Sequence, residues 1–114
     1  MDLRGIEMTW LGHATFRFRT GDGTTVIVDP WLEGNPACPE AEHAQDRVDA
    51  IFITHGHFDH MADAEPLAKQ HGCPVFAIHE VAVHLELQGV EGVVGLNKGG
   101  TVEGPGGITG TMVD

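Results

Sequence analysis

The sequence predicts a single domain of the α/β or α+β class, and three observations carry this prediction. The length of 114 residues fits one compact domain. Short apolar segments with strand-like alternation are interleaved with two segments of helical period. Glycine accounts for 16 residues, about twice its average share, which is typical of a chain with many tight turns.

Three strands are expected at the start of the chain. Residues 6–10 and 15–20 alternate between apolar and polar side chains, as half-buried strands do. Glycines flank an aspartate at 21–23, which predicts a hairpin turn. The β-branched run at 24–29 then predicts a returning strand that is buried on both faces. Pro30 ends this strand because proline cannot donate to a β-ladder.

Strands and helices alternate in the rest of the chain. Residues 31–47 contain prolines, a glycine and mixed charges, which predicts a loop with at most one helical turn. The elements expected after it are a strand at 48–54, a helix at 61–70, a strand at 74–78, a helix at 80–88, a strand at 90–96 and a hairpin of 101–102 with 108–113. This order predicts a mixed sheet packed against two helices.

Composition excludes several classes of protein. Six basic against 17 acidic residues give a formal net charge of −11, so we expect neither a nucleic-acid partner nor a polybasic membrane tether. The sequence has no apolar run of membrane-spanning length and no signal peptide, which predicts a cytoplasmic protein without a membrane partner. Cys38 and Cys73 are far apart and form no paired motif, so we expect two thiols that are at least partly buried.

The segment that follows the strand at 48–54 carries the chemistry. It reads His55-x-His57-x-Asp59-His60 and joins this strand to a helix. In an extended stretch residues i and i+2 project to the same side, so His55 and His57 can aim two imidazoles at one point. Asp59 and His60 then serve a second point nearby as the chain turns. Imidazole nitrogen and carboxylate oxygen suit Zn²⁺, Mn²⁺ or Fe.

The sequence resembles the metallo-β-lactamase superfamily, first of all in the segment THGHFDH. The wider pattern resembles a branch of little-characterised metal-dependent hydrolases similar to ascorbate-6-phosphate lactonase. The matching segments are TWLGHATF at 9–16, VDPWLEGNP at 28–36, ITHGHFDHMAD at 53–63 and GLNKGGTVE at 95–103. The resemblance implies an αββα sandwich of two similar halves, with a metal site between the sheets at one edge.

The resemblance also implies roles for single residues. His55 and His57 would bind the first metal ion, and Asp59 and His60 the second. Asp29 would orient a ligand histidine or the nearby backbone, although a carboxylate at a strand end before proline is also an ordinary turn residue.

His13, in the LGHAT segment, is placed by the resemblance near the site, in contact with substrate or with a metal ligand. The alternative is a structural histidine that is merely hydrogen-bonded. The other four histidines, the two tryptophans and the five phenylalanines are interpreted as parts of turns, helices, core or rim.

The implied function is metal-dependent hydrolysis of a small-molecule ester, lactone or phosphoester by a metal-activated hydroxide. One or two divalent ions are expected, with zinc preferred over manganese or iron. Asp59 would ligate the second ion and could also hydrogen-bond the hydroxide or take a proton as the tetrahedral adduct collapses. A nuclease or phosphodiesterase of the same fold is disfavoured by the acidic charge.

The sequence departs from the family pattern at its end. The family's third histidine, bridging aspartate and last histidine come later in its chains, whereas this sequence stops at Asp114. We therefore expect the N-terminal half of a longer hydrolase, weakly active or inactive alone, that exposes an apolar sheet face and self-associates. The alternative is a non-catalytic metal-binding half-domain or a degenerate subunit.

Overall fold

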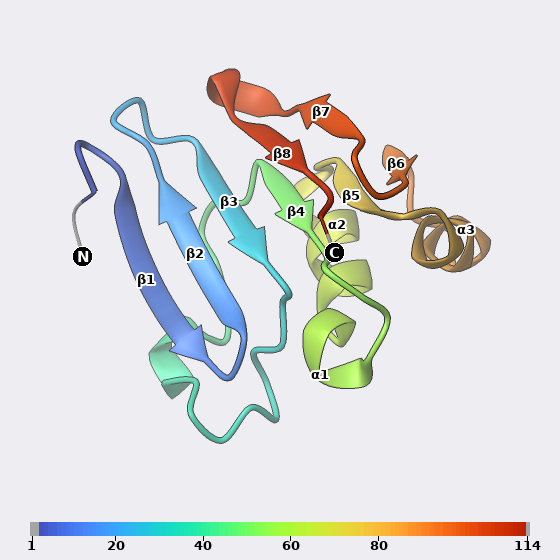
Figure 1. The fold of residues 1–114 in the computed structure, drawn as a ribbon. Helices are drawn as coiled ribbons and strands as arrows, with labels where there is room; N and C mark the ends of the chain where they lie inside the picture. Colours follow the sequence, from blue (N-terminus) through green and yellow to red (C-terminus); the bar gives the residue numbers. More distant parts are fainter. Residues whose placement is uncertain (1–2, 114) are drawn as a thin grey trace.

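The computed structural model describes residues 3–113 and contains one six-stranded mixed sheet (Figure 1). Asp114, where the sequence stops, lies outside the described residues. The strands, in their order across the sheet, are β1 (Glu7–Gly12), β2 (Thr15–Arg19), β3 (Thr25–Val28), β4 (Ala50–Phe52), β5 (Val75–Ile78) and β6 (Val93–Leu96). The first three strands are antiparallel and the remaining pairs are parallel. The α/β class and all six of these strands are confirmed, although several strands are shorter than predicted.

Helices cover one face of the sheet. The helix α2 (Ala64–His71) connects β4 to β5, and α3 (His79–Leu87) connects β5 to β6. Between these helices and the sheet lies the larger hydrophobic core, which includes Ile27, Ile51, Leu67 and Leu85. Short connections from strand to helix to parallel strand place both helices on this one face.

The helix predicted at 61–70 is in fact two helices, α1 (Phe58–Met61) and α2. The interruption falls at Asp63, whose backbone N–H donates to the Pro30 carbonyl at 2.9 Å. Its carboxylate accepts the backbone N–H of Leu32 at 2.6 Å. These contacts tie the loop after β3 to the helix junction, and a local helical pattern carries no signal for them. The prediction of two helices is therefore corrected to three.

A hairpin of β7 (Thr101–Glu103) and β8 (Thr109–Thr111) lies on the opposite face of the sheet, as Figure 1 shows, which confirms the predicted hairpin. Its side chains join a second hydrophobic core around Phe76 and Phe52. The loop at 31–47 holds a single 3₁₀ turn at Glu40–Glu42, as predicted. Within residues 3–113, no helix is long and apolar enough to cross a membrane.

The carboxyl ends of β3 and β4 lie side by side because these two strands are parallel neighbours. The turn from β1 to β2 reaches the same end of the sheet, the lower end in Figure 1, and α1 follows β4 there. Three segments that are distant in the sequence therefore meet at one place.

Candidate metal centre

The strand β4 delivers the histidine-rich segment to this end of the sheet. The ring centroids of His55 and His57 are 4.6 Å apart, and those of His55 and His60 are 4.0 Å apart. His57 is the N-cap residue of α1, so the chain turns there and directs Asp59 and His60 from the first turn of the helix. The rings of the three motif histidines are therefore neighbours, but neither His55 nor His57 belongs to the group of potential metal donors found among residues 3–113.

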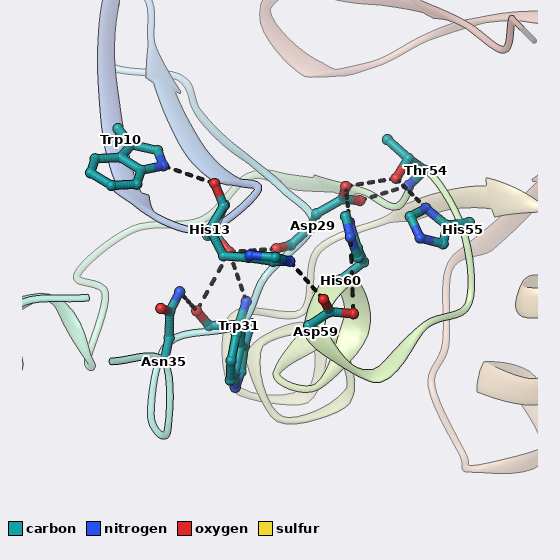
Figure 2. A network of polar contacts seen from close by, with 10 residues as sticks. Trp10, His13, Asp29, Trp31, Asn35, Thr54, His55, Asp59 and His60 are labelled. Atoms are coloured by element: carbon teal, nitrogen blue, oxygen red, sulfur yellow. Dashed lines mark hydrogen bonds and ion pairs between the residues drawn. The ribbon is translucent and has the colours of Figure 1, made fainter. Parts of the chain in front are cut away.

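Asp29 is the buried anchor of the site, with 2% of its surface exposed. Its Oδ1 accepts the backbone N–H of Thr54 at 2.7 Å. Its Oδ2 accepts the Thr54 hydroxyl at 2.6 Å and lies 2.7 Å from Nδ1 of His60 (Figure 2). A carboxylate can only accept, so His60 carries its proton on Nδ1 and leaves Nε2 free to bind a metal ion.

Thr54 extends this arrangement to His55. Its hydroxyl proton is donated to Asp29, and its oxygen lies 2.9 Å from Nδ1 of His55. Because the hydroxyl has one proton, the oxygen accepts from the Nδ1–H of His55. Asp29 thus fixes the tautomer of two histidines, one directly and one through the threonine.

His13 reaches the same site from the turn between β1 and β2. Its Nε2 lies 2.6 Å from Oδ2 of Asp59, and its ring meets that of His60 edge-on at 5.5 Å. His13, Asp59 and His60 form a group whose ligand atoms all lie within 4.8 Å of one another. His13 is therefore among the candidate ligands themselves, nearer to the chemistry than the contact role that the resemblance implied.

Backbone conformation marks this site as well. Among residues 3–113, three non-glycine residues have positive φ, and two of them are His13 (φ 53°) and Asp29 (φ 50°). This region of φ is unfavourable for side chains with a Cβ, and such residues concentrate at functional sites. Gly12 precedes His13, and a Cβ there would lie 2.8 Å from Asn35 Nδ2, so only glycine allows the loop to approach this closely.

Thr15 holds the backbone around Asp29. It is fully buried, and its hydroxyl donates to the Asp29 carbonyl at 2.7 Å and accepts the N–H of Trp31 at 3.1 Å. Sequence reasoning missed Thr15 and Thr54 because a threonine at a strand end reads as an ordinary β-former. Their position directly beside the motif residues was the available signal.

The pKa of Asp59 is lowered. Partial desolvation raises it, but the hydrogen bond from His13, together with its own backbone hydrogen bond and the charges of His60 and His13, outweighs that effect. Asp59 is therefore ionised at neutral pH, the form in which a carboxylate binds a metal ion.

The donor set fits a divalent cation of borderline character. His60 Nε2 and Asp59 Oδ1 are 3.9 Å apart. Ligand atoms about 2.0–2.2 Å from one zinc ion lie at most about 4.3 Å apart, so both atoms can share one coordination sphere. Imidazoles oriented through a buried carboxylate are typical of metal sites in proteins.

Comparison with known proteins shows the family of the chain. The sequence profile of the Metallo-beta-lactamase superfamily matches residues 8–113. A UPF0173 metal-dependent hydrolase of Koribacter versatilis is 52% identical over 113 residues, which cover 99% of this chain and 48% of the relative. A UPF0173 metal-dependent hydrolase of Solibacter usitatus is 53% identical over 96 residues, which cover 84% of this chain and 41% of the relative.

Solved structures give the same result. Igni18, described as a novel metallo hydrolase from Ignicoccus hospitalis, superposes with a TM-score of 0.74 at 32% identity. The superposition covers 86% of this chain and 42% of that one. The chain therefore spans less than half the length of these relatives, and it aligns with their N-terminal half.

Proposed function

This chain belongs to the metallo-beta-lactamase superfamily, and on that premise we propose that it supplies the N-terminal part of a metal-dependent hydrolase centre. The observation that carries the proposal is the network around Asp29, which fixes His60 directly and His55 through Thr54. A buried carboxylate that holds two imidazoles in one tautomer has a clear use where both remaining nitrogens bind an ion.

The residues divide into ligands and supports. His55 and His57 would hold one ion, and Asp59 and His60 a second, with His13 beside the second group. Zinc is our first choice, with manganese and iron compatible with the same donors. Such an ion supplies Lewis acidity and lowers the pKa of a bound water to about 7.

Asp59 has a further role in this proposal. It stays ionised at neutral pH, and its Oδ2 is 2.6 Å from His13 Nε2. It can accept a proton from the attacking nucleophile and pass it to the leaving group, while the Nε2–H of His13 donates the hydrogen bond that holds the carboxylate. The substrate class we propose is a small-molecule ester, lactone or phosphoester.

Zinc titration of the chain tests the metal site. We expect His55→Ala/His57→Ala to weaken zinc affinity by at least about tenfold, measured by calorimetry. His84→Ala, which removes an exposed histidine of α3, is the matched control and should leave the affinity unchanged. Equal affinity in all three proteins would overturn the site.

Activity is measured in the same preparations with p-nitrophenyl acetate as a generic ester. Hydrolysis that requires zinc and disappears in the double variant supports the hydrolase. Zinc binding without hydrolysis favours the alternative of a non-catalytic metal-binding half-domain.

A further inference from the structure

Two aromatic side chains stand beside the candidate metal centre outside both hydrophobic cores. Phe58 is 71% exposed although it is the first residue of α1, immediately before Asp59. Its ring centroid lies 5.9 Å from that of Trp31, with the two planes inclined by 65°. The Trp31 indole in turn meets the His13 imidazole edge-on at 5.7 Å. Phe58, Trp31 and His13 therefore form a continuous row of rings that ends in the donor group.

Trp31 is held firmly in this row. Its backbone N–H donates to the Thr15 hydroxyl at 3.1 Å, and its backbone carbonyl accepts from Asn35 Nδ2 at 2.8 Å (Figure 2). The same Thr15 hydroxyl donates to the carbonyl of Asp29, so one buried side chain fixes both the tryptophan and the anchor of the ligands. These bonds fix the Trp31 backbone relative to Asp29, and the contacts with His13 and Phe58 place its indole beside the donor group.

The packing of the described residues leaves the Phe58 ring exposed. Burial of a phenylalanine side chain is favourable, and leaving it in water forfeits that gain. Aromatic rings prefer inclined or offset partners, and the T-shaped pair of Trp31 and Phe58 leaves ring surface open to a third ring. An exposed ring next to a reactive centre has a use if the ligand covers it.

We propose that Trp31 and Phe58 form an aromatic platform that binds the aryl or other flat apolar group of the substrate. This inference rests on the proposed function and specifies its substrate class as an ester or lactone that carries such a ring. The reactive carbonyl would lie at the donor group while the ring covers Phe58 and packs against the indole.

Few basic side chains could compete with the aromatic platform in selecting the substrate. The chain has 17 acidic and six basic residues. Four of the basic ones, Arg17, Arg19, Arg47 and Lys69, are held in ion pairs with glutamates or an aspartate outside the donor group. The row of rings is a recognition feature that the described residues place at the site.

Two hydroxamates test the platform without relying on turnover. Acetohydroxamic and benzohydroxamic acids chelate zinc through the same atoms, but only benzohydroxamic acid carries a phenyl ring. We expect the zinc-loaded 114-residue chain to bind benzohydroxamate about fivefold more tightly, measured by calorimetry. Phe58→Ala should reduce this preference to less than about twofold and leave the affinity for acetohydroxamate unchanged.

Leu87→Ala is the matched control, because Leu87 is an 80% exposed apolar side chain at the end of α3. It should keep the full preference for benzohydroxamate, and thermal unfolding of each variant verifies that it is folded. Equal binding of the two probes, or a preference that survives Phe58→Ala, would overturn the platform while leaving the metal site intact. Failure of both probes to bind would overturn the metal site and the platform together.

Discussion

Two aspartates, one at each end of the β3–β4 pair, make the same kind of hydrogen bond but have different roles. Asp29 follows β3 and accepts the backbone N–H of Thr54, just beyond β4, at 2.7 Å. Asp49 precedes β4 and accepts the backbone N–H of Thr25, at the start of β3, at 2.7 Å. Each carboxylate joins the ends of the two parallel strands. The pair of strands is thus fastened at both ends by one kind of contact.

The two carboxylates differ in burial and in their remaining partners. The Asp49 side chain is 26% exposed and pairs with Arg47 Nε at 2.8 Å, a contact that reaches into solvent. The Asp29 side chain is 3% exposed, has positive φ and binds the Thr54 hydroxyl and His60. Fastening two strands requires neither burial nor backbone strain, so these extra features of Asp29 belong to the orientation of the histidines.

Asp29→Ala should have the largest effect. It leaves the Thr54 N–H, the Thr54 hydroxyl and His60 Nδ1 without their acceptor at a partly buried place, which costs about 3 kcal/mol in the free energy of unfolding. Zinc affinity should fall by about 10- to 100-fold because His60 loses its fixed tautomer. Urea unfolding and zinc calorimetry measure the two effects. Unchanged zinc affinity in a folded variant would show that Asp29 is merely a strand fastener.

Thr54→Val separates the two functions of Asp29. The variant keeps the backbone N–H that fastens the strands and removes the hydroxyl between Asp29 and His55. We expect a loss of about 1.5 kcal/mol in unfolding free energy and a decrease of about tenfold in zinc affinity. Thr54→Ser restores the hydroxyl and should recover most of the affinity. If serine fails to restore it while the protein remains stable, the proposed relay to His55 is wrong.

Asp49→Asn provides the comparison at the other end. The amide oxygen still accepts the N–H of Thr25, while the ion pair with Arg47 is lost at a partly exposed position. We expect about 1 kcal/mol of destabilisation or less and no change in zinc affinity. A decrease in zinc affinity comparable to that of Asp29→Ala would mean that any weakening of the β3–β4 pair disturbs the site. The distinction between the two ends would then fail.

Much of the fold was predictable because its signals are local. Alternation identified β1 and β2, and the glycine-flanked aspartate at 21–23 identified the hairpin turn between β2 and β3. The break between α1 and α2 was missed because it depends on contacts of Asp63 with Pro30 and Leu32, some thirty residues earlier. Local periodicity has no access to such contacts.

The residues of the candidate site likewise divide into those that local sequence predicted and those that depend on distant contacts. The motif at 55–60 was found because its ligands are close in sequence and share one strand-to-helix connection. The entry of His13 into the donor group depends on its positive φ and on the approach of the loop at 31–38 to Gly12, which only the folded chain defines. The support from Thr15 and Thr54 was missed because the role of a threonine hydroxyl depends on its hydrogen-bond partners, which only the folded chain defines.

The smallest effect is expected at Asp22, near the amino-terminal end of β3. It lies in the turn before β3, is exposed, and receives hydrogen bonds from the Thr20 hydroxyl and from the Thr24 N–H at 3.0 Å. These contacts, with the charge of Arg47, lower its pKa from 3.8 to about 2. A carboxyl whose pKa is lower in the folded state stabilises it above the unfolded pKa, and this contribution is lost as pH falls through the folded pKa. Asp22→Asn should therefore destabilise the chain slightly at pH 7, and the difference from the native chain should vanish between pH 4 and pH 2.

Thermal unfolding at pH 7, 4 and 2.5 measures this difference, with zinc calorimetry at pH 7 in parallel. A difference that is the same at all three pH values would show that the asparagine acts through the geometry of the turn and not through charge. Zinc affinity should be unchanged, because this carboxylate serves the turn into β3 and the candidate ligands lie beyond the other end of that strand. The effects of replacing the three aspartates around β3 would then increase with the burial of each side chain. The exposed Asp22 would affect only acid stability, the partly exposed Asp49 overall stability, and the buried Asp29 both stability and the metal centre.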